Sequence, residues 1–309
     1  MSDRDAPSDR ALDWVAPSAQ ALDWVARQVG LPVEATRLLS GGKSSAVHAA
    51  TVDGEELVLR QFIDREWWAS EPDPAMREAA ILRLLERSDV PTNRLIAVDD
   101  DGSESEHPTV LMSLIPGEIV LEPDDVDAWL EAMASVLPQI HALPVTPDEL
   151  PQTYFRYHAD EALIVPDWSH EPDAWRAAFD ALQEPAPPYE PTFIHRDYHP
   201  ANILFADGQV SGVIDWVNAC RGPAGVDVGH CRLNLAILHG VDVAERFRAA
   251  YGRITGLGQD PYWDLMTAVQ FLSEPDMFRL WTDLGVPAIA RETLRARMDA
   301  YVASIVERL

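Results

Sequence analysis

The sequence predicts an α+β fold with two lobes, a small lobe rich in β-strands and a larger lobe that is mostly helical. Short strand-like runs dominate residues 36–116, where one helical pattern interrupts them. Helical periodicity dominates residues 117–309, apart from strand-like runs at 193–216. The length of 309 residues suits two domains, because a domain averages about 150 residues. We therefore expect three parts: a helical extension over 1–35, the small lobe over 36–116 and the large lobe over 117–309.

The N-terminal extension contains the sequence ALDWVA at residues 11–16 and again at 21–26. A spacing of ten residues does not match the repeat unit of any solenoid, and the sequence occurs only twice. Two short amphipathic turns explain the pattern, as does one helix that breaks at Pro17 and restarts with Ser18 as its N-cap. We therefore expect helical structure here without a repeat architecture.

The small lobe should contain five strands and one helix. Its strand-like runs are TRLLSGG, AVHAATVD, ELVLRQF, RLIAVDD and TVLMSLI. The sequences GGKSS and DGEE, which separate the first three runs, are typical of hairpin turns. A helix is expected over 74–87, because proline lies in its first turn and apolar residues follow with helical spacing. The lobe should end near Pro116 and Gly117, which are turn residues.

The large lobe is predicted to be mainly helical. Helical patterns cover residues 123–142, 225–239, 242–254, 261–273 and 287–308. Residues 144–191 form a stretch that is rich in proline, acidic residues, tryptophan and tyrosine. The strand-like runs at 193–216 surround a cluster of polar residues, and this combination marks the region as a candidate site.

The composition excludes several classes of partner. The chain has 24 basic and 51 acidic residues, a net charge of −27, and such a surface repels the phosphates of nucleic acids. The acidity either serves solubility and adaptation to salt or attracts a cationic small molecule. No uncharged apolar run approaches the ~18 residues of a membrane span, and the N-terminus lacks the apolar region of a signal peptide. Two cysteines give no disulfide framework, so we expect a cytoplasmic protein without membrane partners.

The strongest functional signal lies in HRDYHPANIL and the following VIDW. These sequences place His195, Asp197, Asn202 and Asp215 in the pattern H-x-D-x-x-x-x-N followed by an aspartate after a short hairpin. The segment resembles the catalytic segment of the aminoglycoside phosphotransferase family, which are small-molecule antibiotic kinases that include macrolide-phosphotransferase-like members. The resemblance covers nearly the whole chain from about residue 36 and implies a protein-kinase-like bilobal fold.

The family resemblance implies a role for each polar residue of the motif. Asp197 would be the catalytic base that accepts the hydrogen bond, and then the proton, of the acceptor hydroxyl. Asn202 and Asp215 would be the ligands of Mg²⁺, which prefers hard oxygen atoms. His195 would have a packing role that shapes the loop. Asp227, in the sequence GPAGVDVGHC, would buttress the catalytic loop and is expected to be structural.

The resemblance also implies that the small lobe binds ATP or GTP. LLSGGKSSAVHAA resembles the hairpin that covers the nucleotide, where glycines let the backbone approach phosphates. It is not a Walker A loop, because that motif needs glycine at the position of Arg37. Backbone groups near residues 112–114 would hold the purine base. The residues implied in nucleotide binding are Gly41, Gly42, Lys43, Ser44, Arg60, Glu78, Met112, Ser113 and Leu114.

Two side chains are alternatives for the main phosphate contact. Arg60 occupies the strand position at which protein kinases have their phosphate-binding lysine, and Glu78 is its natural ion-pair partner. Its planar guanidinium gives a contact geometry different from that of an ammonium group. Lys43, the only lysine of the chain, lies in the covering hairpin and offers a second solution. The sequence leaves both open.

The acceptor is expected to be a small molecule with a hydroxyl group, which would bind to the large lobe. Carboxylates that would bind a cationic amino-sugar are Asp160, Glu161, Glu171, Asp173, Asp264, Glu274 and Asp276. Aromatic residues that would instead line an apolar pocket for a macrolide-like molecule, or belong to the core, are Tyr262, Trp263, Phe271, Phe278 and Trp281. The spacing of these residues does not distinguish a cationic acceptor from an apolar one. We expect the protein to be a monomer or a weak dimer.

The favoured function is a magnesium-dependent O-phosphotransferase that acts on an antibiotic such as an aminoglycoside or a macrolide. A housekeeping sugar or amino-alcohol kinase and a catalytically silent nucleotide-binding module are alternatives. A zinc-dependent hydrolase would need His195 and His199 with a third ligand from Cys220, His230 or Cys231. That third ligand has no motif-like spacing to the two histidines, so the zinc alternative is the weakest.

Overall fold

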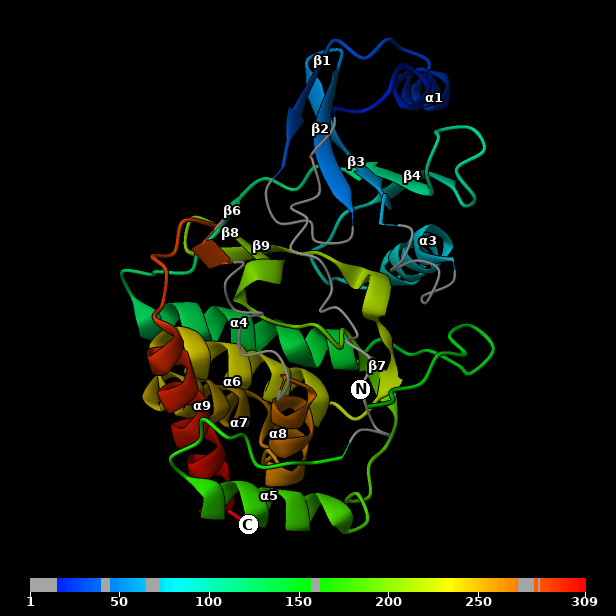
Figure 1. The fold of residues 1–309 in the computed structure, drawn as a ribbon. Helices are drawn as coiled ribbons and strands as arrows, with labels where there is room; N and C mark the ends of the chain where they lie inside the picture. The colour runs from blue at the N-terminus through cyan, green and yellow to red at the C-terminus, as the bar shows by residue number, and fades with distance from the viewer. Residues whose placement is uncertain (1–15, 40–44, 65–72, 157–161, 272–280, 283) are drawn as a thin grey trace, which may run out of the picture. The chain divides into compact units, whose positions relative to one another are not determined.

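The computed structural model describes residues 16–39, 45–64, 73–156, 162–271, 281–282 and 284–309. The chain divides into two units (Figure 1). The first unit consists of Met1–Ala80 and Arg94–Leu114, and the second of Ile81–Asn93 and Ile115–Leu309. The described residues combine an antiparallel sheet with eight α-helices, which is the predicted α+β class. None of these described helices has both the length and the apolar character that crossing a membrane requires.

The sheet of the first unit has five antiparallel strands in the order β1-β2-β3-β5-β4. The strands are β1 (Ala35–Leu38), β2 (Ala46–Val52), β3 (Glu55–Gln61), β4 (Leu95–Asp99) and β5 (Thr109–Ser113). Each of the five predicted strand-like runs therefore forms a strand. The position of β3 at the centre of the sheet matters for function, because it carries Arg60 with Val47 on one side and Val110 on the other.

A two-residue hairpin turn sets the register of β2 and β3. Val52 pairs with Glu55, and the two residues between them, Asp53 and Gly54, have φ angles of 50° and 76°. Positive φ at both turn positions is the type I′ geometry, whose twist matches that of the flanking strands and which favours the sequence Asp-Gly. The expected DGEE turn is confirmed in this form.

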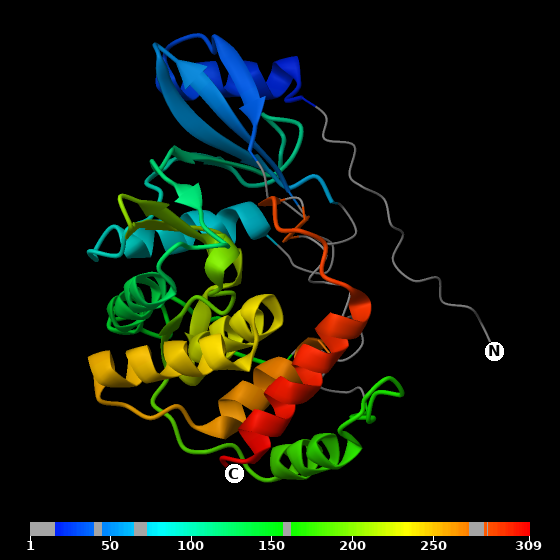
Figure 2. The same ribbon diagram turned by 90° about the vertical axis from the view of Figure 1, so that its left-hand side faces the viewer.

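Helix α1 (Ala19–Val29) belongs to the core of the first unit (Figure 2). The side chain of Ser18 accepts a hydrogen bond from the backbone N–H of Ala21, which confirms Ser18 as the N-cap. Trp24 is buried in one hydrophobic cluster with Leu59 of β3 and Leu111 of β5. Helix α3 (Pro74–Leu85) confirms the helix expected over 74–87 and begins in the first unit.

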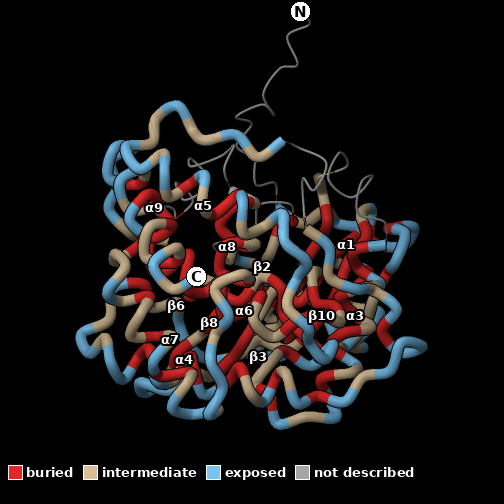
Figure 3. Tube along the Cα trace, turned by 90° about the horizontal axis from the view of Figure 1, so that it is seen from below, coloured by how far each residue is buried: buried red, intermediate tan, exposed pale blue. Residues whose placement is uncertain are grey.

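The second unit is built around helix α6 (Gly225–His239), in which every residue from Val226 to Leu238 is buried (Figure 3). Helices α7 (Val241–Thr255), α8 (Pro261–Ala268) and α9 (Arg291–Val306) contact it, and α4 (Val126–His141) packs against α7. Helix α5 (Pro172–Gln183) also belongs to this unit. A helix that is buried on every side forms the centre of its domain, and this burial fixes the orientation of the side chains on α6.

Two small antiparallel sheets of the second unit hold the polar motif. One sheet contains β6 (Glu118–Ile119), β8 (Ile203–Ala206) and β9 (Gln209–Val213), and the other pairs β7 (Thr192–Ile194) with β10 (Cys220–Gly222). The loop from residue 195 to 202 connects β7 to β8, and Asp215 lies between β9 and β10. The strand-like runs predicted at 193–216 are thus present and bring both parts of the motif into one unit.

Helix α5 was not predicted, because proline and acidic residues dominate its surroundings in the sequence. Its first helical residue is proline, a favourable position, and Trp175, Ala178 and Phe179 form its buried face with helical spacing. The buried carboxylate of Asp299 in α9 holds this region in place. Asp299 Oδ1 accepts hydrogen bonds from Trp175 Nε1 and Ser169 Oγ, both at 2.7 Å.

A buried ion network joins three helices of the second unit. Arg232 of α6 is fully buried and forms ion pairs with Asp264 of α8 and Glu245 of α7. Arg308 also binds Asp264, at 2.7 Å from its Oδ2 atom. Asp264 was a candidate for binding a cationic acceptor, but its carboxylate is fully buried between two arginines. It therefore serves the packing of α6 against α8.

We expect Asp264→Asn to destabilise the second unit by about 3–5 kcal/mol, because it leaves the buried charge of Arg232 without its main partner. Glu131→Ala is the matched control, since Glu131 pairs with Arg253 at the surface, where both side chains are more than half exposed. That change should cost less than about 1 kcal/mol. Urea unfolding followed by helical circular dichroism measures both. Similar losses for the two variants would contradict a structural role for the buried network.

Candidate active site

His195 shapes the loop between β7 and β8. Its ring is fully buried, packs on Trp216 with a distance of 4.4 Å between ring centroids, and uses both nitrogen atoms. Nδ1 accepts a hydrogen bond from the Asp197 N–H at 3.2 Å, so the ring proton is on Nε2, which donates to Ile214 O at 2.9 Å. The predicted packing role is confirmed. Because both nitrogens are engaged, His195 does not offer the zinc ligand of the hydrolase alternative.

Asp227, in the first turn of α6, holds the backbone of this loop. Its fully buried carboxylate accepts hydrogen bonds from the N–H groups of His195 at 2.8 Å and of Arg196 at 2.6 Å. His141 Nε2 of α4 lies 3.1 Å from the same carboxylate. Arg196 has a φ of 70°, a left-handed conformation that costs free energy in a residue other than glycine. Asp227 stabilises that conformation with charge-assisted bonds, which confirms its expected structural role.

The carboxylate of Asp197 follows directly after this strained residue and is partly exposed, with 29% of its side-chain surface accessible. Its Oδ1 atom lies 3.0 Å from His230 Nε2 and 3.5 Å from His199 Nε2. Its Oδ2 atom accepts a hydrogen bond from Asn202 Nδ2 at 3.3 Å. Burial opposes the charged form, but the imidazoles of His199 and His230 outweigh it and hold the pKa of Asp197 well below its ordinary value. Asp197 is therefore an ionised hydrogen-bond acceptor.

His199 stabilises the end of the loop by capping the helical turn that follows it. Its Nδ1 accepts a hydrogen bond from Ala201 N–H at 3.2 Å, which caps the short 3₁₀ helix Pro200–Asn202. Burial lowers the pKa of His199 to about 4 against the opposing effect of Asp197, so the ring is neutral near pH 7. With Nδ1 as acceptor, the single ring proton lies on Nε2, which is 3.2 Å from Asn202 Nδ2 and 3.5 Å from Asp197 Oδ1.

The group Asp197, His199 and His230 has metal-binding residue types, with ligand atoms within 4.8 Å of one another. However, zinc at His199 Nε2 would have to displace the proton that the cap at Nδ1 leaves there. Cys220 and Cys231, the cysteines of the zinc alternative, are buried and do not belong to this group. The geometry thus favours a hydrogen-bonded carboxylate over a zinc centre.

The predicted magnesium ligands, Asn202 and Asp215, lie on two segments that a backbone hydrogen bond links. Ile214 N–H donates to Asn202 O at 3.0 Å, and Ile214 O accepts the bond from His195. Asp215 follows at once, with a left-handed φ of 66°. The amide nitrogen of Asn202 donates to Asp197 O at 2.9 Å, which leaves its carbonyl oxygen on the other edge of the amide group. A carboxylate and a carbonyl oxygen on joined segments fit the ligand preferences of Mg²⁺.

In the first unit, the predicted ion pair between Arg60 and Glu78 is present and buried. Arg60 Nη1 lies 2.7 Å from Glu78 Oε1 of α3, and Arg60 Nε donates to Ser45 Oγ at 2.9 Å. Of the residues expected to hold the base, Met112 and Ser113 end strand β5, and Ser113 N–H already donates to Arg94 O. Leu114 is the next residue. The predicted hairpin residues Gly41, Gly42, Lys43 and Ser44 lie outside the described residues.

The structure shows different environments for the residues of the second unit that were candidates for binding the acceptor. Glu171 is the N-cap residue of α5, and Asp173 pairs with Arg176 on the same helix. Trp263 is buried against Ile194, Cys220 and Val226 and is therefore a core residue. Tyr262 packs on Trp263, with ring centroids 5.1 Å apart, and Trp281 is buried. Asp160, Glu161, Glu274, Asp276, Phe278 and the side chain of Phe271 lie outside the described residues.

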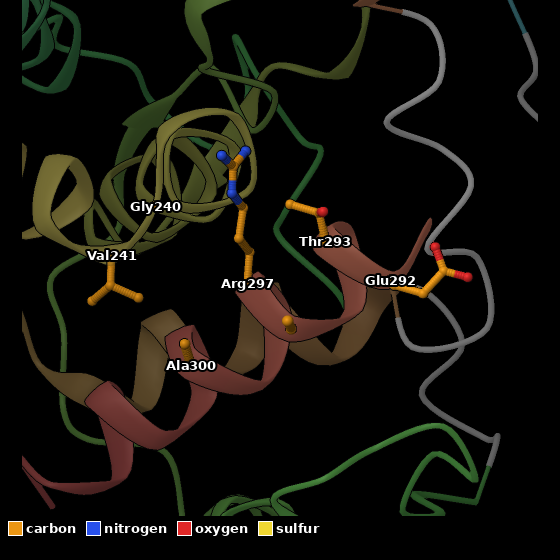
Figure 4. A pocket seen from close by; sticks show the side chains of 7 residues that line it. Gly240, Val241, Glu292, Thr293, Arg297 and Ala300 are labelled. Carbon is orange, nitrogen blue, oxygen red and sulfur yellow. The ribbon is translucent and has the colours of Figure 1, made fainter. Parts of the chain in front are cut away.

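A shallow hollow beside α9 contains none of the predicted site residues (Figure 4). It is lined by Gly240, Val241, Glu292, Thr293, Ala296, Arg297 and Ala300. Arg297 donates to Ile237 O at 2.7 Å and Leu238 O at 2.6 Å, the last carbonyl groups of α6. An arginine at this end satisfies these carbonyls and the negative end of the helix dipole, so Arg297 has a structural role.

The contact between His230 and Asp197 was not predicted from the sequence, in which His230 was a candidate only for a zinc ligand. A signal was available, since His230 follows Asp227 by three residues on a predicted helix. Residues three apart share one face of a helix, so a helix that buttresses the loop with Asp227 also directs His230 toward it.

The sequence matches the phosphotransferase enzyme family over residues 34–269. The chain belongs to this family. Its membership confirms the resemblance drawn from HRDYHPANIL and VIDW, and with it the predicted enzyme class, a phosphotransferase with an alcohol group as acceptor. No curated protein sequence matches this family member.

Solved structures of aminoglycoside phosphotransferases share the fold of this phosphotransferase. A thermostable variant of APH(4)-Ia with AMP-PNP and hygromycin B matches with a TM-score of 0.63 and 17% identity over 93% of this chain and 99% of that one. The streptomycin–ATP–APH(2″)-IIa complex matches with a TM-score of 0.57 and 15% identity over 87% and 91%. A Ralstonia eutropha JMP134 protein assigned to the aminoglycoside phosphotransferases matches with a TM-score of 0.59 and 18% identity over 95% of this chain and 99% of that one. These matches confirm the protein-kinase-like fold.

We expect Asp227→Asn to loosen the catalytic loop, because the amide cannot accept charge-assisted bonds from both the His195 and Arg196 N–H groups. The free energy of unfolding should fall by about 2–4 kcal/mol. Hydrogen–deuterium exchange measured by mass spectrometry should accelerate in peptides that cover residues 193–199.

Asp180→Asn, an exposed change on α5, is the matched control for Asp227→Asn and should shift stability by less than about 0.5 kcal/mol. Unchanged exchange at residues 193–199 in the Asp227→Asn protein would show that the carboxylate does not hold the loop.

Proposed function

We propose that the chain is a magnesium-dependent O-phosphotransferase that moves the γ-phosphoryl group of ATP or GTP to a hydroxyl group of an antibiotic such as an aminoglycoside or a macrolide. The observation that carries this proposal is the partly exposed carboxylate of Asp197. Its Oδ1 atom lies 3.0 Å from His230 Nε2 and 3.5 Å from His199 Nε2, and its Oδ2 atom accepts a hydrogen bond from Asn202. Relatives with the same fold have been solved with AMP-PNP and hygromycin B and with ATP and streptomycin, which supports both halves of the reaction.

Asp197 would orient the acceptor hydroxyl for in-line attack on the γ-phosphorus atom. In a loose transition state the bond to the leaving oxygen breaks before the new O–P bond is fully formed, so the hydroxyl becomes acidic late. A carboxylate with a low pKa suits this order, because it holds the hydroxyl by a hydrogen bond and accepts its proton as the new bond completes. The proton leaves the hydroxyl oxygen for the carboxylate, and the nucleoside diphosphate is the leaving group.

Asn202 and Asp215 would hold Mg²⁺ through the carbonyl oxygen of one and the carboxylate of the other. When bound, the ion neutralises charge on the nucleotide phosphates. The backbone hydrogen bond between Ile214 N–H and Asn202 O fixes the positions of both ligands relative to the catalytic loop. The left-handed conformation of Asp215 supports this assignment, because backbone strain in a residue other than glycine concentrates at functional sites.

In the first unit, Arg60 would contact the nucleotide phosphates. Glu78 and Ser45 bind two of its nitrogen atoms and thereby fix the plane of the guanidinium group. Lys43 stays the alternative contact. Leu114 follows directly after β5, and Ser113 N–H is used by Arg94 O, so we assign the backbone contact with the purine base to Leu114 in particular.

A cationic acceptor fits the chain better than an apolar one. The net charge of −27 would attract a polycation, and Trp263, one of the aromatic candidates, belongs to the hydrophobic core. Hygromycin B and streptomycin are present in the complexes of the similar solved structures. We place the reaction in the cytoplasm, where ATP is available and thiols such as Cys220 and Cys231 stay reduced. A housekeeping amino-alcohol kinase would use the same residues, and the acceptor screen distinguishes it.

Asp197→Asn should reduce phosphoryl transfer by at least about a thousandfold, because the amide cannot accept the proton of the acceptor. Its affinity for the nucleotide should remain within about twofold, since Asp197 acts on the acceptor. The measurement is mass spectrometry of aminoglycosides, macrolides, cyclic-peptide antibiotics and amino-alcohols incubated with the protein, Mg²⁺ and ATP or GTP. A gain of one phosphoryl mass with the unmutated protein alone is the expected result.

Three outcomes would contradict parts of this assignment. Equal transfer by Asp197→Asn would remove Asp197 as the base. Nucleotide binding without transfer to any acceptor class would favour the silent nucleotide-binding module, and phosphorylation of amino-alcohols alone would favour the housekeeping kinase.

We expect the double variant Arg60→Gln/Glu78→Gln to bind Mg²⁺·AMP-PNP about 10–100-fold more weakly, the value of a lost charge-assisted contact. Replacing both residues avoids leaving Glu78 buried without its partner. Lys43→Ala is the matched variant for the other candidate contact. Isothermal titration calorimetry measures each affinity, and a loss confined to Lys43→Ala would transfer the role of main phosphate contact from Arg60 to Lys43.

A further inference from the structure

Helix α6 contacts the catalytic loop at two successive points. Asp227 binds the backbone N–H groups of His195 and Arg196, and His230, three residues later on α6, reaches the side chain of Asp197. Residues three apart lie one above the other on a helix, so both contacts come from the same face. One helix thus determines both where the loop backbone runs and how the carboxylate of the proposed base is turned.

The helix that carries His230 is itself firmly held. Gly229, the preceding residue, lies so close to α8 that an added Cβ atom would approach Thr267 Oγ1 to 2.9 Å. Arg232, two residues after His230, is anchored by the buried ion pair with Asp264. His230 itself is 7% exposed. Its imidazole therefore projects from a rigid element and has little freedom to follow a moving partner.

The two imidazoles at Asp197 differ in what they can fix. His199 belongs to the same loop as Asp197 and caps the 3₁₀ helix that follows, so it moves with the carboxylate. Its Nε2 atom is also the more distant, at 3.5 Å from Oδ1 compared with 3.0 Å for His230. Of the two, His230 alone ties the carboxylate to a separate, buried element.

The hydrogen-bond capacity of Asp197 shows which oxygen atom remains for an acceptor. A carboxylate oxygen accepts two hydrogen bonds. Among the residues that the structure describes, Oδ1 receives the bond from His230 at 3.0 Å and lies 3.5 Å from His199 Nε2, whereas Oδ2 receives only the long bond from Asn202 at 3.3 Å. Because the two oxygen atoms of a carboxylate are equivalent, a half-turn restores this arrangement, but rotation through a smaller angle turns both oxygen atoms away from it.

We propose that His230 is a positioning residue of the phosphotransferase: its Nε2–H group holds Oδ1 of Asp197 so that Oδ2 faces the acceptor hydroxyl. This inference rests on the proposed function of Asp197. It assigns His230 no contact with the acceptor or the nucleotide. Loss of the bond lets the carboxylate rotate, which reduces the fraction of bound complexes that are aligned for transfer and leaves binding unchanged.

The test compares three variants by steady-state kinetics. His230→Leu removes the donor and keeps an apolar side chain, and kcat should fall about 10–100-fold with the KM values for acceptor and nucleotide within about twofold. His230→Gln retains an N–H donor and should recover most of that loss. His239→Gln, at the C-terminal end of the same helix, is the matched control and should leave kcat unchanged. Thermal unfolding of each variant confirms that it is folded.

Crystal structures of the unmutated protein and of both His230 variants separate this inference from the proposed function. We expect one orientation of the Asp197 carboxylate in the unmutated and His230→Gln proteins, and a rotated or doubled orientation in His230→Leu. If the unmutated protein transfers no phosphoryl group, the proposed function fails, and the carboxylate orientation still decides whether His230 positions Asp197. An unchanged orientation in His230→Leu, an unchanged kcat, or a raised acceptor KM at constant kcat would overturn the proposal.

Discussion

The pair of hydrogen bonds that Asp227 accepts from the backbone of His195 and Arg196 is the interaction on which the candidate active site depends. Arg196 has a left-handed conformation that is unfavourable on its own, so the loop needs an external partner to keep its course. Asp227 supplies that partner from the first turn of a fully buried helix, where a negative charge also suits the helix dipole. The positions of Asp197, His199 and Asn202 follow from this constraint.

A second connection makes the catalytic loop and the proposed metal ligands one assembly. The ring of His195 donates to the backbone of Ile214, and the N–H group of Ile214 donates to the backbone of Asn202. Asp215 is therefore fixed by the same bonds that shape the loop around Asp197. The functional side chains are few, and buried groups with purely structural tasks, above all His195 and Asp227, determine where they lie.

Local patterns in the sequence predicted the elements whose structure depends on neighbouring residues. The Asp53–Gly54 turn and the Ser18 N-cap are of this kind, because turn geometry and capping require particular residues at fixed spacing. The spacing from His195 to Asp215 likewise indicated the family. Partnerships across the fold were harder to predict. The burial of Asp264 by Arg232 depends on which faces of α6 and α8 meet, and α5 was obscured by the prolines and carboxylates around it. His230 was seen only as a metal ligand, although its spacing from Asp227 pointed to the loop.

We propose that α6 holds the catalytic loop in the conformation that carries out phosphoryl transfer. The most direct test of this proposal is the rate of the transfer step in a single turnover, measured by rapid quench with saturating acceptor and nucleotide, for the unmutated protein and Asp227→Asn. We expect the transfer step of Asp227→Asn to be at least about tenfold slower than that of the unmutated protein, with unchanged affinity for the nucleotide. Equal transfer rates in the two proteins would contradict it.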